Sequence, residues 1–152
     1  MVVGGVSSSA YYDTGQWKDK KSQLEEMKVQ QAVQQLRMIE QKVKAHEMAH
    51  KAAGGDLTGP VKYKYKKGPD GKLYIVGGEV PIKLKQGKTP EETIQIAQKI
   101  KRAALAPADP SAQDRAVAAA ASMLEMRAKA ELAKQQKNQQ NTESGQKISI
   151  YA

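Results

Sequence analysis

The sequence predicts a small, helix-dominated α+β domain with one long helix, a β-hairpin with a short extra strand, and two further helices. Apolar residues recur at helical spacing in three stretches, strict alternation marks one strand, and Gly or Pro pairs separate the elements. The 152 residues are 39% hydrophobic, enough for one modest domain. We place this domain at 17–134, between a flexible Gly- and Ser-rich segment at 1–16 and a polar, Gln-rich tail at 135–152.

The first helix is expected from Trp17 to about Ala53, where Gly54-Gly55 ends it. Apolar residues mark its inner face, and from Leu36 onward they and both histidines of the chain recur at intervals of 3, 4, 3 and 4 residues. The stripe consists of Leu24, Met27, Leu36, Ile39, Val43, His46 and His50. Both imidazoles should therefore point toward the core.

A β-hairpin is expected next. Alternation in the 61–66 segment predicts a strand that packs Val61, Tyr63 and Tyr65 on one face and exposes lysines on the other. A Gly-Pro-Asp-Gly turn and a second strand at 72–76 complete the hairpin. Gly77-Gly78 predicts a bulge or a close approach of another backbone before a short third strand at 79–82.

Two helices should follow. Thr89-Pro90-Glu91-Glu92 supplies an N-cap, a first-turn proline and a capping-box glutamate for a helix that ends before Pro107. Its buried side should hold Ile94, Ala97, Ile100 and Ala104. The third helix should begin at Ser111 and bury Val117, Ala121, Leu124, Ala128 and Leu132. The final Ile148-Ser-Ile-Tyr151 could add an edge strand or engage a partner, although most short apolar ends do neither.

Both histidines lie in His46-Glu47-Met48-Ala49-His50, which has the form H-E-x-x-H. Residues i and i+4 lie about 40° apart around a helix, so two imidazoles can converge on one ion. Glu47 points about 100° away from His46 and can reach a water that the ion activates. We predict a zinc site with His46 and His50 as ligands and Glu47 as general base. The alternatives are two core histidines with ordinary hydrogen-bond partners, or a surface helix.

A catalytic zinc ion usually has three protein ligands, so one more donor is needed. Glu79 is the only carboxylate of an apolar strand that should approach the first helix, and we predict it as the third ligand; its alternative is an exposed edge-strand residue. Asp114 is the second candidate, although its capping-box position after Ser111 explains it without a metal. Glu125 is expected to form a surface ion pair. An oxyanion could be stabilised by Arg115, Tyr63, Tyr65 or Tyr74, among which the sequence does not select.

Composition limits the partners and the compartment. Without cysteine, a metal site must use His with Asp or Glu, and disulfides are excluded. No apolar run reaches the length of a membrane span and no signal peptide is recognisable, so we expect a cytoplasmic protein or one exported without such a signal. The net charge of +9 would attract anions, but no nucleic-acid-binding module is present and we do not expect nucleic acid as the partner.

Four segments together resemble the SprA-related family of bacterial metallopeptidases. They are Val43-Lys-Ala-His-Glu-Met-Ala-His-Lys-Ala-Ala-Gly-Gly55, Gly68-Pro-Asp-Gly71, Val76-Gly-Gly-Glu-Val80 and Ala104-Leu-Ala-Pro-Ala-Asp-Pro-Ser-Ala-Gln-Asp-Arg-Ala116. The resemblance covers roughly residues 40–134 and implies a zincin-like domain that binds zinc through His46 and His50. It implies Glu47 as the catalytic base, and it points to Glu79 first and Asp114 with Arg115 second as further site residues.

The predicted activity is zinc-dependent hydrolysis of peptide bonds in a peptide or protein substrate. By analogy with other zincins, the 61–67 strand would pair with an extended substrate, and its lysines would favour acidic peptides. One alternative is a basic helical module that binds nucleic acid or a bacterial assembly. Another is a zinc-bound but inactive zincin that acts as a scaffold. The sequence leaves the substrate and the oligomeric state open.

Overall fold

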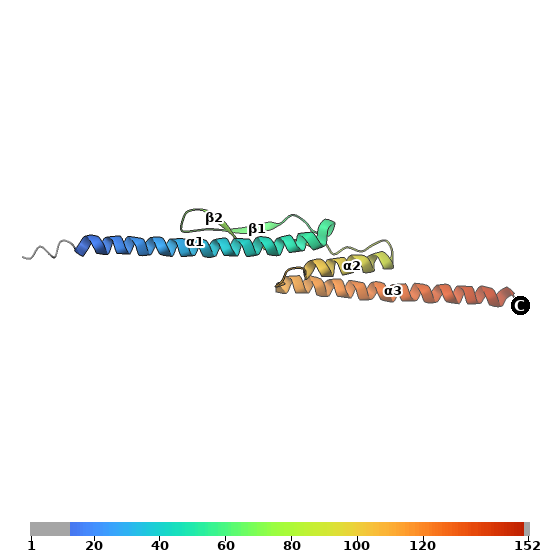
Figure 1. Ribbon diagram of the computed structural model, residues 1–152. Coiled ribbons are helices and arrows are strands. Elements are labelled where there is room, and N and C mark those ends of the chain that lie inside the picture. The colour runs from blue at the N-terminus through green and yellow to red at the C-terminus, as the bar shows by residue number, and fades with distance from the viewer. Residues whose placement is uncertain (1–12, 151–152) are drawn as a thin grey trace, which may run out of the picture. The chain divides into compact units, whose positions relative to one another are not determined.

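A computed structural model describes the backbone of residues 13–150 and the side chains of residues 15–145. The elements follow the order α1 (Asp13–Gly54), a 3-10 turn η2 (Gly55–Leu57), β1 (Lys62–Lys67), β2 (Leu73–Glu79), α2 (Pro90–Ala104) and α3 (Ala112–Ile150) (Figure 1). The two strands form an antiparallel sheet. The predicted helix-dominated α+β class is therefore confirmed.

The described chain forms two compact units, and α1 contributes to both. The hairpin unit consists of residues 13–41 with 64–77. The helical unit consists of residues 42–63 with 78–150. Each unit has its own internal contacts and is described separately below.

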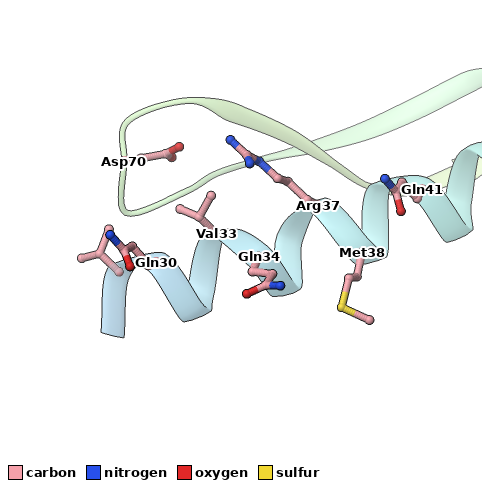
Figure 2. A pocket seen from close by; sticks show the side chains of 8 residues that line it. Gln30, Val33, Gln34, Arg37, Met38, Gln41 and Asp70 are labelled. Carbon is pink, nitrogen blue, oxygen red and sulfur yellow. The ribbon is translucent and has the colours of Figure 1, made fainter. Parts of the chain in front are cut away.

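In the hairpin unit, the hairpin packs on α1 through Tyr74 and Ile75, both of which are buried. The Glu40 carboxylate accepts a hydrogen bond of 2.8 Å from the backbone N–H of Ile75. The Tyr74 hydroxyl donates to Asp70 in the turn, where Gly71 takes the positive φ of 81° that favours glycine. A cavity of about 590 Å³ lies along α1 beside this turn, and Arg37 extends from the helix toward the hairpin there (Figure 2).

The first half of α1 departs from the predicted inner stripe. All side chains from 15 to 31 are exposed, including Leu24 and Met27, and Ile39 is 40% exposed. Leu36 and Val43 are half-buried. The prediction that Leu24, Met27 and Ile39 pack inward is wrong for the described residues of this unit. The segment stays helical because Gln, Lys and Glu are good helix formers, whether or not one face is covered.

The strands test three further expectations. β2 continues through Gly77-Gly78 to Glu79, neither glycine has a positive φ, and side chains of other segments approach both glycines closely. The predicted third strand is reduced to one antiparallel bridge between Thr58 and Ile82. Tyr65 is 61% exposed, so the expected packed face of β1 is not formed there. Glycine in a strand often marks a close approach of another group, and the missing side chain of Gly78 permits its contact with Glu47.

The helical unit has the thin core that its composition predicts. Leu57, Ile100 and Ala121 form its centre, and the half-buried Ile82, Ile96 and Val117 pack against them. α2 lies along α3 (Figure 1), and alanines are buried on both helices. Thr89 caps α2 by accepting from the N–H of Glu92 at 3.1 Å, as predicted. The Glu92 carboxylate accepts from the N–H of Lys88 at 2.8 Å, one residue before the expected donor.

Both predicted terminal segments contain helix. α1 begins at Asp13, inside the segment expected to be flexible, while residues 1–12 of that segment lie outside the described residues. α3 continues through the Gln-rich tail to Ile150, so Ile148–Ile150 are helical and form no edge strand; Tyr151 is not among the described residues. All described side chains from 133 to 145 are exposed, so this part of α3 is helical but buries no side chains. Gln, Lys, Glu and Ala favour this conformation.

None of the described helices combines the length and the apolar character that a membrane span requires.

Candidate metal centre

The two histidines of α1 face each other one turn apart. Their Nε2 atoms lie 3.2 Å from each other, and the rings are nearly perpendicular with centroids 4.8 Å apart. His50 is 2% exposed and His46 is half-buried. The i, i+4 spacing therefore brings the two nitrogens close together, as the sequence predicts.

Asp114 joins them from the first turn of α3. One of its carboxylate oxygens lies 3.2 Å from Nε2 of His46 and the other 3.3 Å from Nε2 of His50. Ligand atoms of these three residues lie within 4.8 Å of one another, and they form the potential metal-binding group among the described residues. The sequence separation of 68 residues between His46 and Asp114 shows that tertiary packing assembles the group.

Asp114 also caps α3. Its backbone N–H donates to Oγ of Ser111 at 3.1 Å, and its carboxylate accepts from the N–H of Ser111 at 2.8 Å. Burial pushes the pKa of Asp114 upward, but these hydrogen bonds and the nearby histidines outweigh burial and leave the pKa below the ordinary value of 3.8. The carboxylate is therefore ionised at neutral pH, the form that a metal ligand requires. The capping role and a ligand role are compatible in one side chain.

The other ring nitrogen of His50 fixes its tautomer. Nδ1 lies 2.8 Å from the carbonyl oxygen of Ala103 in α2, and a carbonyl can only accept, so Nδ1 carries the proton and donates. In the neutral ring, Nε2 then holds a lone pair directed at Asp114 and His46. Metal-binding histidines commonly have such a partner, because it orients the ring.

These donor positions fit a zinc ion. Donors bound at about 2.0–2.1 Å to one tetrahedral ion lie roughly 3.3–3.4 Å from one another. The nitrogen–nitrogen distance of 3.2 Å agrees with that value, and each nitrogen has a different oxygen of Asp114 at a similar distance, Oδ2 at 3.2 Å from His46 and Oδ1 at 3.3 Å from His50. Two imidazoles and a carboxylate are also ligands that zinc accepts. The three residues could thus hold zinc.

Glu47 lies beside this group and is 3% exposed. Its Oε2 has no hydrogen-bond partner among the described residues, which is unusual for a buried carboxylate and calls for an explanation. Burial raises the pKa of Glu47 above the ordinary value of 4.5, while His46 and His50 oppose this rise. A raised pKa brings a carboxylate closer to the neutral range in which a general base works.

Gly78 of β2 covers Glu47. A Cβ at position 78 would lie 2.9 Å from Cγ and 3.0 Å from Oε1 of Glu47, closer than real side chains approach. The lack of a side chain is therefore what lets the strand close over the carboxylate. The Gly-Gly pair was the sequence signal for this contact, although we predicted a bulge or a backbone contact rather than a side-chain contact. The hydrogen bond of His50 to the Ala103 carbonyl could not be predicted from the sequence, because every residue type has a backbone carbonyl.

The other candidates occupy different positions. Glu79 is exposed, accepts from Gln113 at 3.3 Å and is not a member of the donor group. Arg115 is exposed and donates to the carbonyl of Pro110 at 3.1 Å. Glu125 pairs with Lys129 at 2.8 Å, which confirms the surface ion pair. Tyr65 and Tyr74 belong to the hairpin unit, and Tyr63 is a half-buried residue of the helical unit.

Fold and site together define a helix-dominated α+β protein in which two histidines of one helix and an aspartate of another converge beside a buried glutamate. The sequence model of the SprA-related family matches residues 13–150, and the chain belongs to this family. The match extends beyond the roughly 40–134 segment expected from the motifs. No curated protein and no solved structure matches the chain.

Proposed function

We propose that this protein is a zinc-dependent metallopeptidase. The observation that carries the proposal is the convergence of His46, His50 and Asp114 within bonding range of one ion. Next to them lies a buried carboxylate oxygen of Glu47 that has no hydrogen-bond partner within the part of the chain that the structure describes. Structural core histidines would leave that oxygen unexplained. A general base beside a zinc site explains both features.

The roles divide as follows. His46, His50 and Asp114 would hold the ion, which when bound supplies Lewis-acid activation of a water and of the scissile carbonyl. Glu47 accepts the proton of the attacking water and returns it to the leaving amine. The Ala103 carbonyl holds the His50 ring in the ligand tautomer. Ser111 holds the Asp114 carboxylate toward the histidines while it caps α3.

We favour Asp114 over Glu79 as the third ligand because Asp114 already lies 3.2–3.3 Å from both Nε2 atoms. Glu79 is exposed and accepts a hydrogen bond from Gln113. Zinc content in Asp114→Ala and in Glu79→Ala distinguishes the two assignments. Loss in the first and retention in the second is the expected result, and the reverse would restore Glu79 as the ligand.

The substrate would be a peptide or protein in an extended conformation. The lysines at 62, 64, 66 and 67 of β1 are exposed and would favour acidic residues where the substrate runs along that strand. Cleavage profiling with mixed peptides tests this preference. Equal cleavage of acidic and neutral sequences would remove the role of the lysines and leave the zinc chemistry unaffected.

The decisive test of catalysis is Glu47→Gln, which keeps the size of the side chain and removes its basicity. We expect this variant to retain zinc and to lose hydrolysis of a peptide mixture by at least about 100-fold, the lower end of a general-base contribution. The matched control is Glu79→Gln, an exposed change that should leave most activity. Equal activity of Glu47→Gln and wild type would contradict the proposal.

A zinc-binding protein without hydrolytic activity is the second candidate. The specific observation in its favour is the burial of Glu47 under Gly78, since a base must meet water to act. Under this alternative, wild type and Glu47→Gln bind zinc equally and neither cleaves peptides. The same pair of proteins therefore separates the two candidates.

A further inference from the structure

A cavity of about 590 Å³ opens directly beside the donor group. Ala45, His46 and Ala49 of α1 form one side, and the 106–109 loop between α2 and α3 forms the other. His46 belongs to both the cavity lining and the donor group, so the cavity adjoins the potential metal ligands. Its volume lies within the range of about 300–1,000 Å³ that is usual for ligand sites.

The lining is mainly apolar and small. Alanines on both sides, together with the buried Pro107, leave the space free because none of them carries a long side chain. Besides His46, the charged residues of the lining are Lys42 and Asp109, which have opposite signs. The cavity therefore suits an apolar group better than a charged one.

The loop side of the cavity leads directly into the first turn of α3, which carries the third ligand. Arg115 donates to the carbonyl of Pro110 at 3.1 Å, and Ser111 forms the cap with Asp114. The loop that lines the cavity is thus followed in the chain by the first turn of α3, which carries Asp114. Consecutive Cα atoms of a peptide are about 3.8 Å apart, so a peptide bound with its carbonyl at the donor group would place a neighbouring side chain close to this cavity.

We propose that this cavity is the specificity pocket of the enzyme and takes a large apolar side chain, such as Leu or Phe, next to the scissile bond. The inference rests on the proposed zinc peptidase function. A glycine at that position would leave the cavity unfilled, and an acidic residue would meet an apolar lining. Burying a side chain of this size should strengthen binding about 10- to 100-fold over glycine.

The test uses the full zinc-loaded chain and two zinc-binding probes, N-acetylglycine hydroxamate and N-acetylleucine hydroxamate, which differ only in the isobutyl group. Isothermal titration calorimetry should give the leucine probe about 10- to 100-fold tighter binding to wild type. Ala108→Leu and Ala45→Leu fill the cavity from its two sides and should abolish most of this difference. Both should keep the zinc content and the affinity for the glycine probe.

Ala119→Leu is the matched control, because this alanine is exposed on α3 and does not line the cavity. It should keep the full preference for the leucine probe. Equal binding of both probes to wild type, or a preference that survives Ala108→Leu, would overturn the pocket and leave the zinc site intact. Failure of wild type to bind zinc and the glycine probe would overturn the proposed function, and the pocket with it.

Discussion

At the scale of single residues, Asp114 contacts both the cap of α3 and the two histidines. Its carboxylate accepts from the N–H of Ser111 and lies within 3.3 Å of both histidine Nε2 atoms. Capping alone explains the first contact but not the second. A comparison of Asp114 with its capping partner therefore separates the two roles.

We predict that Ser111→Ala lowers stability by about 1 kcal/mol, as loss of an N-cap does, and keeps zinc affinity within about tenfold. Asp114→Ala should keep the bond from the backbone N–H of residue 114 to Oγ of Ser111 and lose the reciprocal bond from the Ser111 N–H. It should also weaken zinc binding by more than the roughly 10- to 100-fold typical of an outer-shell change. Competition with a zinc chelator measures both variants. Equal zinc affinity of the two would show that Asp114 is only a cap.

Gly78 sets the position of Glu47. We predict that Gly78→Ala displaces the Glu47 carboxylate, because the new Cβ would lie 2.9 Å from its Cγ. A shift of about 1 Å can lower activity about 100-fold, and zinc content should not change. Gly77→Ala is the control, since its Cβ would meet Lys64 at an ordinary 3.6 Å. Similar peptide hydrolysis rates in both variants would contradict this assignment.

The Asp70–Tyr74 pair makes the hairpin unit sensitive to acid. The hydrogen bond from Tyr74 holds the pKa of Asp70 in the folded protein below its ordinary value of 3.8. The ionised Asp70 therefore stabilises the fold above pH 3.8, and this stabilisation is lost as the pH falls through the lower pKa of the folded state. We predict that Tyr74→Phe returns the pKa of Asp70 toward the ordinary range. Carboxyl NMR titration measures it, and an unchanged pKa in the variant would refute the account.

At the scale of elements, the packing of α2 on α3 depends on a small number of buried residues. Ile100 is fully buried in the centre of the helical unit. We predict that Ile100→Ala lowers the free energy of unfolding by about 2–5 kcal/mol, as large core truncations do. Ile39→Ala, at a position 40% exposed, should cost below about 1 kcal/mol. Urea unfolding compares them, and equal losses would contradict the assigned core.

Elements with local signals were predicted well. The start of α2 follows from Thr89-Pro90, because a cap and a first-turn proline act within one turn. The pair Gly77-Gly78 predicted a bulge or a close approach without selecting between them, since a glycine signals freedom of the backbone but not how that freedom is used. The apolar spacing of Leu24 and Ile39 predicted burial, yet spacing shows only which residues share a face and not whether another element covers it.

At the scale of the whole molecule, the site could be predicted in part. His46 and His50 share one helix, so their spacing was sufficient to predict that the two imidazoles converge. The third carboxylate could not be selected, because only the fold decides which distant side chain reaches the histidines. We ranked Glu79 above Asp114 on strand proximity, whereas the structure brings Asp114 to the histidines.

The exposed end of α3 should be dispensable for the site. Because all described side chains from 133 to 145 are exposed, deletion of residues 135–152 should leave the thermal midpoint and the zinc content unchanged while it lowers the helical signal in circular dichroism. The result also tests the predicted domain boundary at 134. A truncated chain that unfolds or loses zinc would place the boundary further on.

Zinc stoichiometry of the full chain tests the central claim most directly. Elemental analysis after zinc loading and gel filtration should give one ion per chain for wild type and for Glu47→Gln, and almost none for His46→Ala or His50→Ala. Each protein should first show wild-type helix content, so that loss of zinc reports the ligand and not the fold. A wild-type chain without zinc, or unchanged zinc in His46→Ala, would contradict the account.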